Sequence, residues 1–303
     1  MSDNAESQPL IKTAAPYRGR FAPSPSGPLH FGSLVAAVGS YMQARANRGQ
    51  WLVRIENIDP PREMPGATDI ILRQLELFGL HWDESLLYQS DRSQAYDETL
   101  QRLADAGLSY HCNCTRKSIM ARGGYYSGHC RKRDLGPDNT ALRFVNHHPV
   151  AEFDDQLQGK IILPSDFANE DFIIRRRDGL YAYQLAVVVD DIDTGITEVV
   201  RGADLITPTG RQIAFFNALG STAPDYLHLP LATHADGHKL SKQTHAPALR
   251  EDQRVLELID ALKFLGQKVP NECQDGSVDE VLQWGVAHWQ LDRVAKCEKI
   301  AID

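Results

Sequence analysis

The segment from Arg20 to Ser33 constrains the fold most, because it places turn-forming residues directly before a run with helical periodicity. Apolar side chains recur at helical spacing between Leu34 and Arg48. We therefore expect a strand end, a turn and a helix, with the turn at the helix N-terminus. Free backbone N–H groups and the positive end of the helix dipole favour phosphate or carboxylate there. Regular structure across the segment is excluded by three prolines and a glycine, Pro23, Pro25, Gly27 and Pro28.

The rest of the chain predicts an α/β fold with an insertion. A strand at Trp51–Glu56 completes a strand, helix, strand unit, and such units form parallel sheets whose ligands bind at the carboxyl ends of the strands. Glu56 should therefore lie near the Arg20 loop. From Ser109 to about Ala182, short strand-like runs replace amphipathic helices. Downstream we expect a buried strand at 181–191, a helix at 208–220, a strand at 226–231 and helices from about residue 255.

Charge and composition narrow the class of protein. The chain has 303 residues and a formal charge of -8, which argues against a protein that coats nucleic acid indiscriminately. Between Thr115 and Arg133, however, six basic residues occur without an acidic one, which could be a local RNA contact or a solvated face. No segment is typical of a signal peptide or a membrane span, and five unevenly spaced cysteines favour a reducing, cytoplasmic setting.

Two motifs are ambiguous when each is considered alone but informative when they are considered together. Taken alone, His30 could be a polar helix cap, and Lys239-Leu240-Ser241-Lys242-Gln243 a solvated turn. Together they resemble the two nucleotide-binding motifs of class I aminoacyl-tRNA synthetases. The first of these motifs ends in His-Ile-Gly-His, and the second reads Lys-Met-Ser-Lys-Ser. The stretch is most similar to the glutamate and glutamine enzymes and, among them, to the glutamyl-queuosine tRNA(Asp) synthetases. A Walker phosphate loop and a Gly-x-Gly-x-x-Gly fingerprint are absent from the sequence.

The resemblance, which runs from Arg18 to about Pro247, implies a domain organisation. It implies a Rossmann-like parallel-sheet catalytic domain at 17–108 and 183–250, with a zinc-binding insertion at 109–182 that is similar to an acceptor-binding domain. Residues 1–16 are expected to be a disordered tail. Residues 251–303 are expected to be a short helical C-terminal segment without an anticodon-binding domain.

The family chemistry assigns the nucleotide end of the site. Adenylate formation builds negative charge on the phosphates, so fixed cationic donors must surround them. The resemblance implies that His30, Lys239 and Lys242 are catalytic. It places ATP against His30, Gly32, Ser33 and Lys242. The chain departs from the family pattern at four positions, Ser33, Asn57, Leu240 and Gln243.

The resemblance also implies a glutamate site. Glu56 would accept the α-ammonium, Arg20 and Arg201 would share the two carboxylates, and Tyr183 would add a hydroxyl. The sequence leaves open which arginine takes which carboxylate. Asp190-Asp191-x-Asp193 is interpreted as a capped turn after a buried strand rather than a cation site. The full set of expected glutamate contacts is Arg20, Phe21, Ala22, Pro23, Ser24, Glu56, Tyr183 and Arg201.

Three clustered cysteines suggest a metal site. Cys112, Cys114 and Cys130 could bind zinc, and spacing alone nominates His111 or His129 as the fourth ligand. Glutamyl-queuosine synthetases instead carry a tyrosine between the second and third cysteines, and this chain reproduces that spacing. The resemblance therefore implies one Zn²⁺ per chain, held by Cys112, Cys114, Tyr126 and Cys130.

The implied reaction has two halves. The chain would activate L-glutamate with ATP and Mg²⁺ without needing tRNA, and then transfer glutamate to queuosine in the anticodon of tRNA(Asp). The nearest alternative is a truncated glutamyl-tRNA synthetase that charges the 3′ end of tRNA(Glu). A non-catalytic paralogue is a third hypothesis. We expect a monomer that has no membrane partner.

Overall fold

Parallel strands form the centre of the molecule. The computed structural model describes residues 16–234 and 247–302. One sheet has the order β1-β2-β3, and β9 pairs with β10 beside it. β1 lies next to β9, where the Thr197 N–H donates to the Arg18 carbonyl at 2.9 Å. The bounds are β1 Arg18–Phe21, β2 Gln50–Ile55, β3 Leu87–Tyr88, β9 Glu198–Gly202 and β10 Asp225–Leu229.

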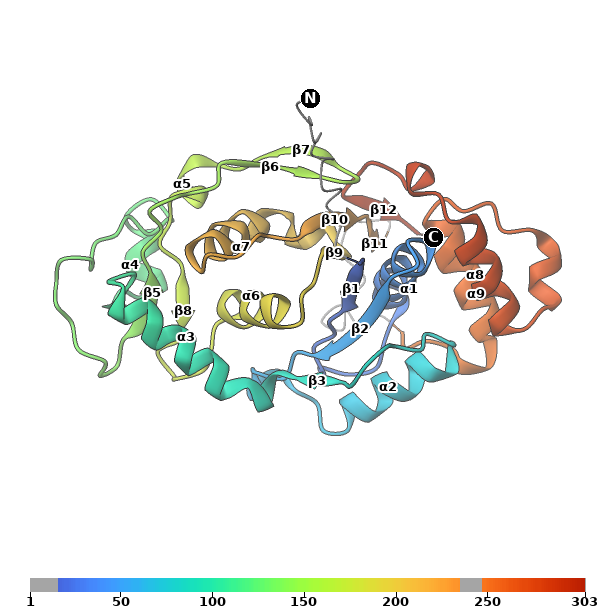
Figure 1. Ribbon diagram of the computed structural model, residues 1–303, viewed down its shortest axis with the longest axis horizontal. Helices are drawn as coiled ribbons and strands as arrows, with labels where there is room; N and C mark the ends of the chain where they lie inside the picture. The colour runs from blue at the N-terminus through green and yellow to red at the C-terminus, as the bar shows by residue number, and fades with distance from the viewer. Residues whose placement is uncertain (1–15, 235–246, 303) are drawn as a thin grey trace, which may run out of the picture.

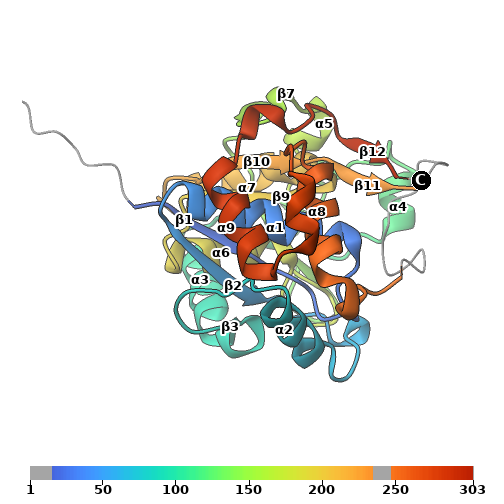
Figure 2. The same cartoon turned by 90° about the vertical axis from the view of Figure 1, so that its right-hand side faces the viewer.

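The helix predicted after the opening loop is confirmed. Helix α1 (Phe31–Ala46) joins β1 to β2 and buries most of its residues. Two C-terminal helices, α8 (Arg254–Phe264) and α9 (Val278–His288), cover it from outside (Figure 2). The apolar side chains of these three helices share one core with those of β1 and β2. Helix α2 (Ala67–Leu77) closes the same core from below in Figure 1.

The predicted strand-rich segment lies at the other end of the molecule (Figure 1). Its strands β4, β5 and β8 form an antiparallel sheet, and β6 and β7 form a hairpin. The hairpin reaches back to the centre, where the Gln156 N–H donates to the Tyr226 carbonyl at 2.8 Å. The segment comprises β4 Ser109–Cys112, α4 Arg116–Met120, β5 Ala141–Phe144, β6 Glu152–Asp155, β7 Gly159–Ile162, α5 Ser165–Ala168 and β8 Ile173–Arg175. The division of the chain into domains stays a prediction.

The buried strand predicted at 181–191 is wrong. Tyr183–Asp193 form helix α6, which is buried along most of its length. Its apolar run has no period, so the sequence does not distinguish a buried strand from a helix enclosed on all sides. Helices α3 (Ser93–Asp105) and α7 (Ile206–Ala218) flank α6, and Phe144 and Phe172 of the strand-rich segment join the same apolar core.

The C-terminal segment contains a strand that the helical prediction missed. Strand β12 (Lys299–Ala301) pairs in parallel with β11 (Leu231–Thr233). Three residues are too few to show a strand period, so the sequence carries little signal for it. Among the described residues, no helix is long and apolar enough to cross a membrane.

Candidate active site

Arg20 and Glu56 lie at the carboxyl ends of neighbouring parallel strands. Arg20 is the third residue of β1, and Glu56 directly follows β2. The Glu56 N–H donates to the Pro23 carbonyl at 3.0 Å, which holds the start of the opening loop against the end of β2. The predicted proximity of Glu56 to the Arg20 loop is therefore confirmed.

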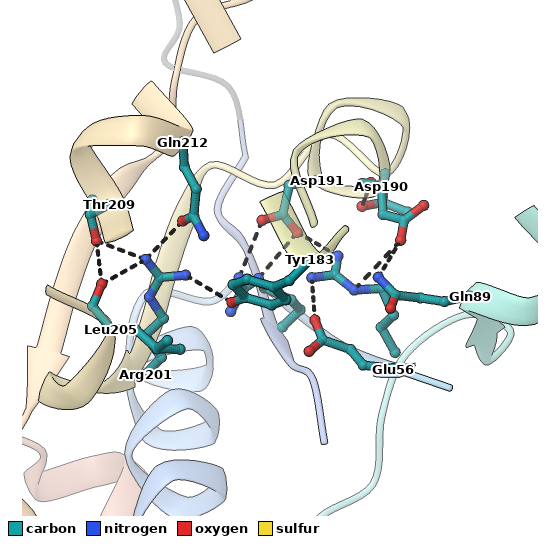
Figure 3. Close-up of polar contacts among 12 residues, drawn as sticks. Glu56, Gln89, Tyr183, Asp190, Asp191, Arg201, Leu205, Thr209 and Gln212 are labelled. Atoms are coloured by element: carbon teal, nitrogen blue, oxygen red, sulfur yellow. Dashed lines mark hydrogen bonds and ion pairs between the residues drawn. The ribbon is translucent and has the colours of Figure 1, made fainter. Parts of the chain in front are cut away.

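Arg201, on β9, has most of its guanidinium fixed before any ligand binds. Its Nη2 donates to Thr209 Oγ1 at 2.7 Å and to Gln212 Oε1 at 2.8 Å, both from α7. Its Nη1 donates to the Tyr183 hydroxyl at 3.4 Å (Figure 3). Arg201 is 6% exposed, so its charge acts in a largely desolvated site. Such a preorganised fork suits a carboxylate.

A buried histidine orients Arg201 from behind. Arg201 Nε donates to His228 Nε2 at 3.1 Å, and His228 Nδ1 contacts Asp155 Oδ2 at 2.6 Å. Because Nε2 accepts, Nδ1 carries the proton and donates to the carboxylate. Burial lowers the pKa of His228, although Asp155 opposes that shift, so the ring stays neutral and can accept from Arg201. Burial raises the pKa of Asp155, but hydrogen bonds from His228 and from two backbone N–H groups outweigh this effect and lower it.

The aspartates at the end of α6 form a buried ion-pair cluster. Asp191 accepts hydrogen bonds from Nε and Nη2 of Arg20, both at 3.2 Å, and from Nη1 of Arg54 at 2.5 Å. Asp190 accepts from Gln89 and Tyr96, each at 2.8 Å. The capped turn predicted here is therefore wrong, because these residues belong to the last helical turn. Arg92 pairs with Asp190 at 3.1 Å, so arginines neutralise both carboxylates and no metal cation is needed to balance their charge.

Glu56 is an acidic member of the same group of interacting side chains. Arg54 Nη2 donates to Glu56 Oε1 at 3.2 Å (Figure 3), and the Glu56 side chain is 11% exposed. Burial raises the pKa of Glu56 more than Arg54 and Arg20 lower it. Burial also raises the pKa of Tyr183, whose ring lies between Arg201 and Glu56 in Figure 3. Two arginines, one carboxylate and one phenol thus converge on one buried site.

His30 caps helix α1. Its Nδ1 accepts from the Ser33 N–H at 3.3 Å, and Ser33 Oγ accepts from the His30 N–H at 2.7 Å. This reciprocal pair explains why serine is compatible with the fourth position of the motif. Because Nδ1 accepts, a neutral His30 ring carries its proton on Nε2 and can act as a donor there. The cap and a phosphate contact are therefore compatible.

Lys239 and Lys242 lie outside the described residues, but the residues that flank their motif are placed. Leu249 donates its N–H to the Leu29 carbonyl at 3.1 Å, and Ala248 forms a β-bridge with His30. On the other side, β11 ends at Thr233, one residue before the described part stops at His234. The chain after the second motif therefore contacts the start of the first.

The three predicted cysteines converge in the strand-rich segment. The Sγ atoms of Cys112, Cys114 and Cys130 lie within 4.8 Å of one another, and those of Cys114 and Cys130 are 3.7 Å apart. Zinc–sulfur bonds of about 2.3 Å in a tetrahedron place sulfurs about 3.8 Å apart, so the cluster fits the metal. Burial raises the pKa of Cys130, but hydrogen bonds from Tyr126 and its neighbours outweigh this and lower it to about 7. A thiolate is therefore accessible.

Tyr126, rather than a histidine, lies beside the three cysteines, and its role as the fourth ligand stays a prediction. The Tyr126 hydroxyl accepts the Cys130 N–H at 2.8 Å and interacts with the Cys112 and Cys130 thiols. His111 instead contacts Thr140 through Nδ1 at 2.9 Å, and among the described residues no histidine nitrogen joins the sulfurs. Burial raises the pKa of Tyr126, so only a bound cation would make it a phenolate.

Comparison with known proteins decides the family. Residues 17–264 match the family model "tRNA synthetases class I (E and Q), catalytic domain". The glutamyl-Q tRNA(Asp) synthetase of Klebsiella pneumoniae is 60% identical over 93% of this chain and 96% of its own. The chain belongs to the glutamyl-Q tRNA(Asp) synthetase family. The glutamyl-Q tRNA(Asp) synthetase of Escherichia coli K12 is 59% identical over 93% of this chain and 92% of its own.

A solved structure extends the likeness to the full-length synthetases. The glutamate-tRNA synthetase of Elizabethkingia anophelis matches with a TM-score of 0.76 and 25% identity, over 94% of this chain and 68% of that one. The predicted class I synthetase fold is thus confirmed for a member of the glutamyl-Q tRNA(Asp) synthetase family. The roles of individual site residues stay predictions.

Several residues that build this glutamyl-Q synthetase site were not found from the sequence. Arg54, His228 and Asp155 hold the predicted residues in place without belonging to the predicted set. One signal was available, because Arg54 and His228 each have apolar residues on both sides within their strands. A charged or titratable residue buried in a strand requires a partner, which points to a polar site.

Proposed function

We propose that the protein activates L-glutamate with ATP, without needing tRNA, and transfers the glutamyl group to queuosine in the anticodon of tRNA(Asp). The observation that carries this proposal is the group formed by the buried Arg20 and Arg201 with the partly buried Glu56 and Tyr183, in a chain 60% identical to a glutamyl-Q tRNA(Asp) synthetase. Two cations and one anion complement a dicarboxylic amino acid that carries one ammonium group.

In this proposal Glu56 accepts the α-ammonium group, and Arg20 and Arg201 bind the two carboxylates. Arg20 uses Nε and Nη2 for Asp191, and its Nη1 makes no hydrogen bond to the described residues. Arg201 offers the Nη1 edge that also reaches Tyr183. The loop residues Phe21, Ala22, Pro23 and Ser24 form the adjoining wall. Burial of the site excludes water from the carboxylates and strengthens each ion pair.

The nucleotide lies at the start of α1. An oxygen of the α-carboxylate attacks the α-phosphorus of ATP, which enters with Mg²⁺, and pyrophosphate leaves with the bond to the β-phosphate broken. His30, through Nε2–H, together with Lys239 and Lys242, stabilises the charge on the phosphates. Gly32 and Ser33 present the first turn of the helix to ATP. The contact of Ala248 with His30 supports a second motif close to the first.

Transfer then forms an ester. A ring hydroxyl of queuosine attacks the glutamyl carbonyl, the bond to phosphate breaks, and AMP leaves. The names of the relatives from Klebsiella pneumoniae and Escherichia coli support tRNA(Asp) as the RNA substrate. Zn²⁺, bound by Cys112, Cys114, Cys130 and Tyr126, has a structural role, because it would tie β4 to the basic loop without touching the glutamate site.

Two measurements test the two halves. Pyrophosphate exchange with each amino acid, run without tRNA, should proceed with glutamate alone, and no glutamate-dependent exchange would refute the activation step. Radiolabelled glutamate should then appear on tRNA(Asp) only when that tRNA contains queuosine. Label on the terminal adenosine of tRNA(Glu) would instead identify a truncated glutamyl-tRNA synthetase.

A further inference from the structure

Two arginines of the basic run 115–133 contact sulfurs of the cysteine cluster. Arg122 Nη1 donates to Cys114 Sγ at 3.8 Å, and Arg133 Nη1 donates to Cys130 Sγ at 3.9 Å. Both are long contacts with a neutral thiol, and each becomes a charge-assisted hydrogen bond when the sulfur ionises. Two of the three sulfurs that could hold a metal are therefore already faced by a cation.

A third arginine faces the tyrosine of the same cluster. The Arg143 guanidinium lies 3.7 Å from the centre of the Tyr126 ring, and Arg143 is only 3% exposed. Its Nη1 donates to the Asp171 carbonyl at 2.5 Å, which holds the guanidinium there. A cation over an aromatic face is attracted by the π electrons, and a negative charge on the ring strengthens that attraction.

Backbone turns place the two arginines beside the sulfurs. The Arg122 N–H donates to the Ile119 carbonyl at 2.9 Å, and the Arg133 N–H donates to the Cys130 carbonyl at 3.0 Å. Arg133 Nη1 also donates to Asn113 Oδ1 at 3.2 Å, and Asn113 stands between two of the cysteines in the sequence. These contacts are made by the protein alone, so the arginines are in position before a metal binds.

Arg131, in the same run, has a different partner. Its Nε and Nη2 donate to the Asp171 carboxylate at 2.6 Å and 2.5 Å, and the Tyr110 hydroxyl donates to the same carboxylate at 2.6 Å. The charge of Arg131 is therefore balanced by a carboxylate. Within the described part of the chain, no carboxylate forms an ion pair with Arg122 or Arg133.

The proposed ligand set creates a negative charge that these two arginines can balance. Three thiolates and one phenolate outweigh the charge of Zn²⁺ by about two negative charges. Cys112 and Cys130 are each 1% exposed and Tyr126 is 3% exposed, so little water reaches this excess charge. Buried charge destabilises a fold unless it is paired or hydrogen-bonded.

We infer that Arg122 and Arg133 are outer-sphere partners of a metal bound at this cluster, an inference that rests on the metal site proposed above. Each donates its Nη1–H to one metal-bound thiolate and reduces the negative charge on that sulfur. They orient and tune the ligands and are not ligands themselves. This assignment divides the basic run, because it leaves Arg116, Lys117 and Lys132 as the candidate RNA contacts.

Co²⁺ in place of Zn²⁺ tests the inference, because its bonds to sulfur absorb in the near ultraviolet, where Zn²⁺ gives no band. Arg122→Met and Arg133→Met each remove the N–H donor but keep a long side chain. A sulfur without its hydrogen bond holds its electrons less tightly, so the sulfur-to-cobalt charge-transfer band should move to lower energy. Each variant should also release Zn²⁺ to a competing chelator at about tenfold lower chelator concentration.

Two further variants show whether the effect belongs to the hydrogen bond. Arg133→Lys keeps a cationic donor, so it should restore part of the band position and part of the zinc affinity. Lys132→Met is the matched control, because it removes the neighbouring cation of the run, whose ammonium contacts no sulfur of the described cluster. Its charge-transfer band and its release of zinc should equal those of the unmodified protein.

The outcomes separate this inference from the metal site on which it rests. If the unmodified protein binds neither Zn²⁺ nor Co²⁺, the metal site fails and the inference fails with it. If it binds both and the two methionine variants keep its band position, the inference alone is refuted, even where their melting temperatures fall. An equal loss of zinc affinity in Lys132→Met would also refute it, because the effect would then come from the general positive charge of the run.

Discussion

Arg201 donates its Nε–H to Nε2 of His228 across 3.1 Å, and both residues are buried. This contact needs a neutral imidazole, because a protonated ring has no acceptor on Nε2. The orientation of the cation that we assign to a glutamate carboxylate is therefore tied to the protonation state of His228. Asp155 fixes the tautomer from the opposite side.

His228 should make the protein sensitive to mild acid. Its pKa is lowered in the fold, so below about pH 6.5 the unfolded chain takes up a proton that the native protein does not. The free energy of unfolding should therefore fall as the pH falls from about 6.5, by up to about 1.4 kcal/mol per pH unit. Denaturant unfolding from pH 7.5 to 5.5 measures this slope. His228→Asn should flatten it, whereas His81→Asn, at an exposed position, should not.

Glu56→Gln should raise the KM for glutamate in pyrophosphate exchange about a hundredfold, because a buried amide cannot replace a charge paired with ammonium. In the unmodified protein the KM should also rise as the pH falls, since burial raises the pKa of Glu56 and protonation removes its charge. The variant should lose that pH dependence. Glu84→Gln, in an exposed pair with Arg18, serves as control. An unchanged KM would remove Glu56 from the glutamate site.

Arg54 should matter more for stability than for binding. It contacts Asp191, Glu56 and Asp190, and its side chain is 3% exposed. Arg54→Met would remove a positive charge that balances these buried carboxylates. It should therefore reduce the free energy of unfolding by about 3–5 kcal/mol. Arg73→Met, which breaks an exposed pair with Glu251, should cost less than about 1 kcal/mol. Similar losses in the two variants, measured by urea unfolding, would contradict the assigned role of the cluster.

The parts of the fold that the sequence predicts well are those with local signals. The prolines of the opening loop and the period of α1 mark a turn and a helix within about thirty residues. Glu56 could be placed near Arg20 because a strand, helix, strand unit brings the ends of its strands together. The resemblance to family motifs then identified candidate site residues whose roles could not be inferred from local sequence patterns.

The remaining features depend on contacts between distant segments. The α6 run predicted a strand because its apolar residues have no period, and only the surrounding helices and Phe144 explain why it is helical. Asp155 and His228 are 73 residues apart, so their hydrogen bond has no sequence signature. The same holds for Asp191 and Arg20, which are separated by 171 positions.

Lys242→Ala should depress glutamate activation about a hundredfold or more, as for the loss of one preorganised donor to developing charge. Lys242 is outside the described residues, but the residues after its motif contact His30. The effect should appear in kcat for pyrophosphate exchange with little change in the glutamate KM, because we assign this lysine to the phosphates and not to glutamate. Lys263→Ala, on α8, is the control. Full activity in Lys242→Ala would exclude this lysine from the mechanism.

The cysteine cluster predicts a structural metal with an unusual fourth ligand. Purified protein should contain about one zinc per chain, and a chelator should lower its melting temperature, because the cluster joins β4 to the loop that carries Cys130. Cys112→Ser should lose the metal, whereas Cys297→Ser, outside the cluster, should retain it.

Tyr126→Phe isolates the contribution of the phenol. As a ligand, Tyr126 should raise zinc affinity, so the variant should release zinc to a competing chelator at about tenfold lower chelator concentration. The hydroxyl also accepts the Cys130 N–H, so the variant should lose some stability even without metal. Comparing the metal-free proteins measures that second effect separately. If the metal affinities of the two proteins are equal, Tyr126 holds the loop through its hydrogen bond alone, and a different group completes the tetrahedron.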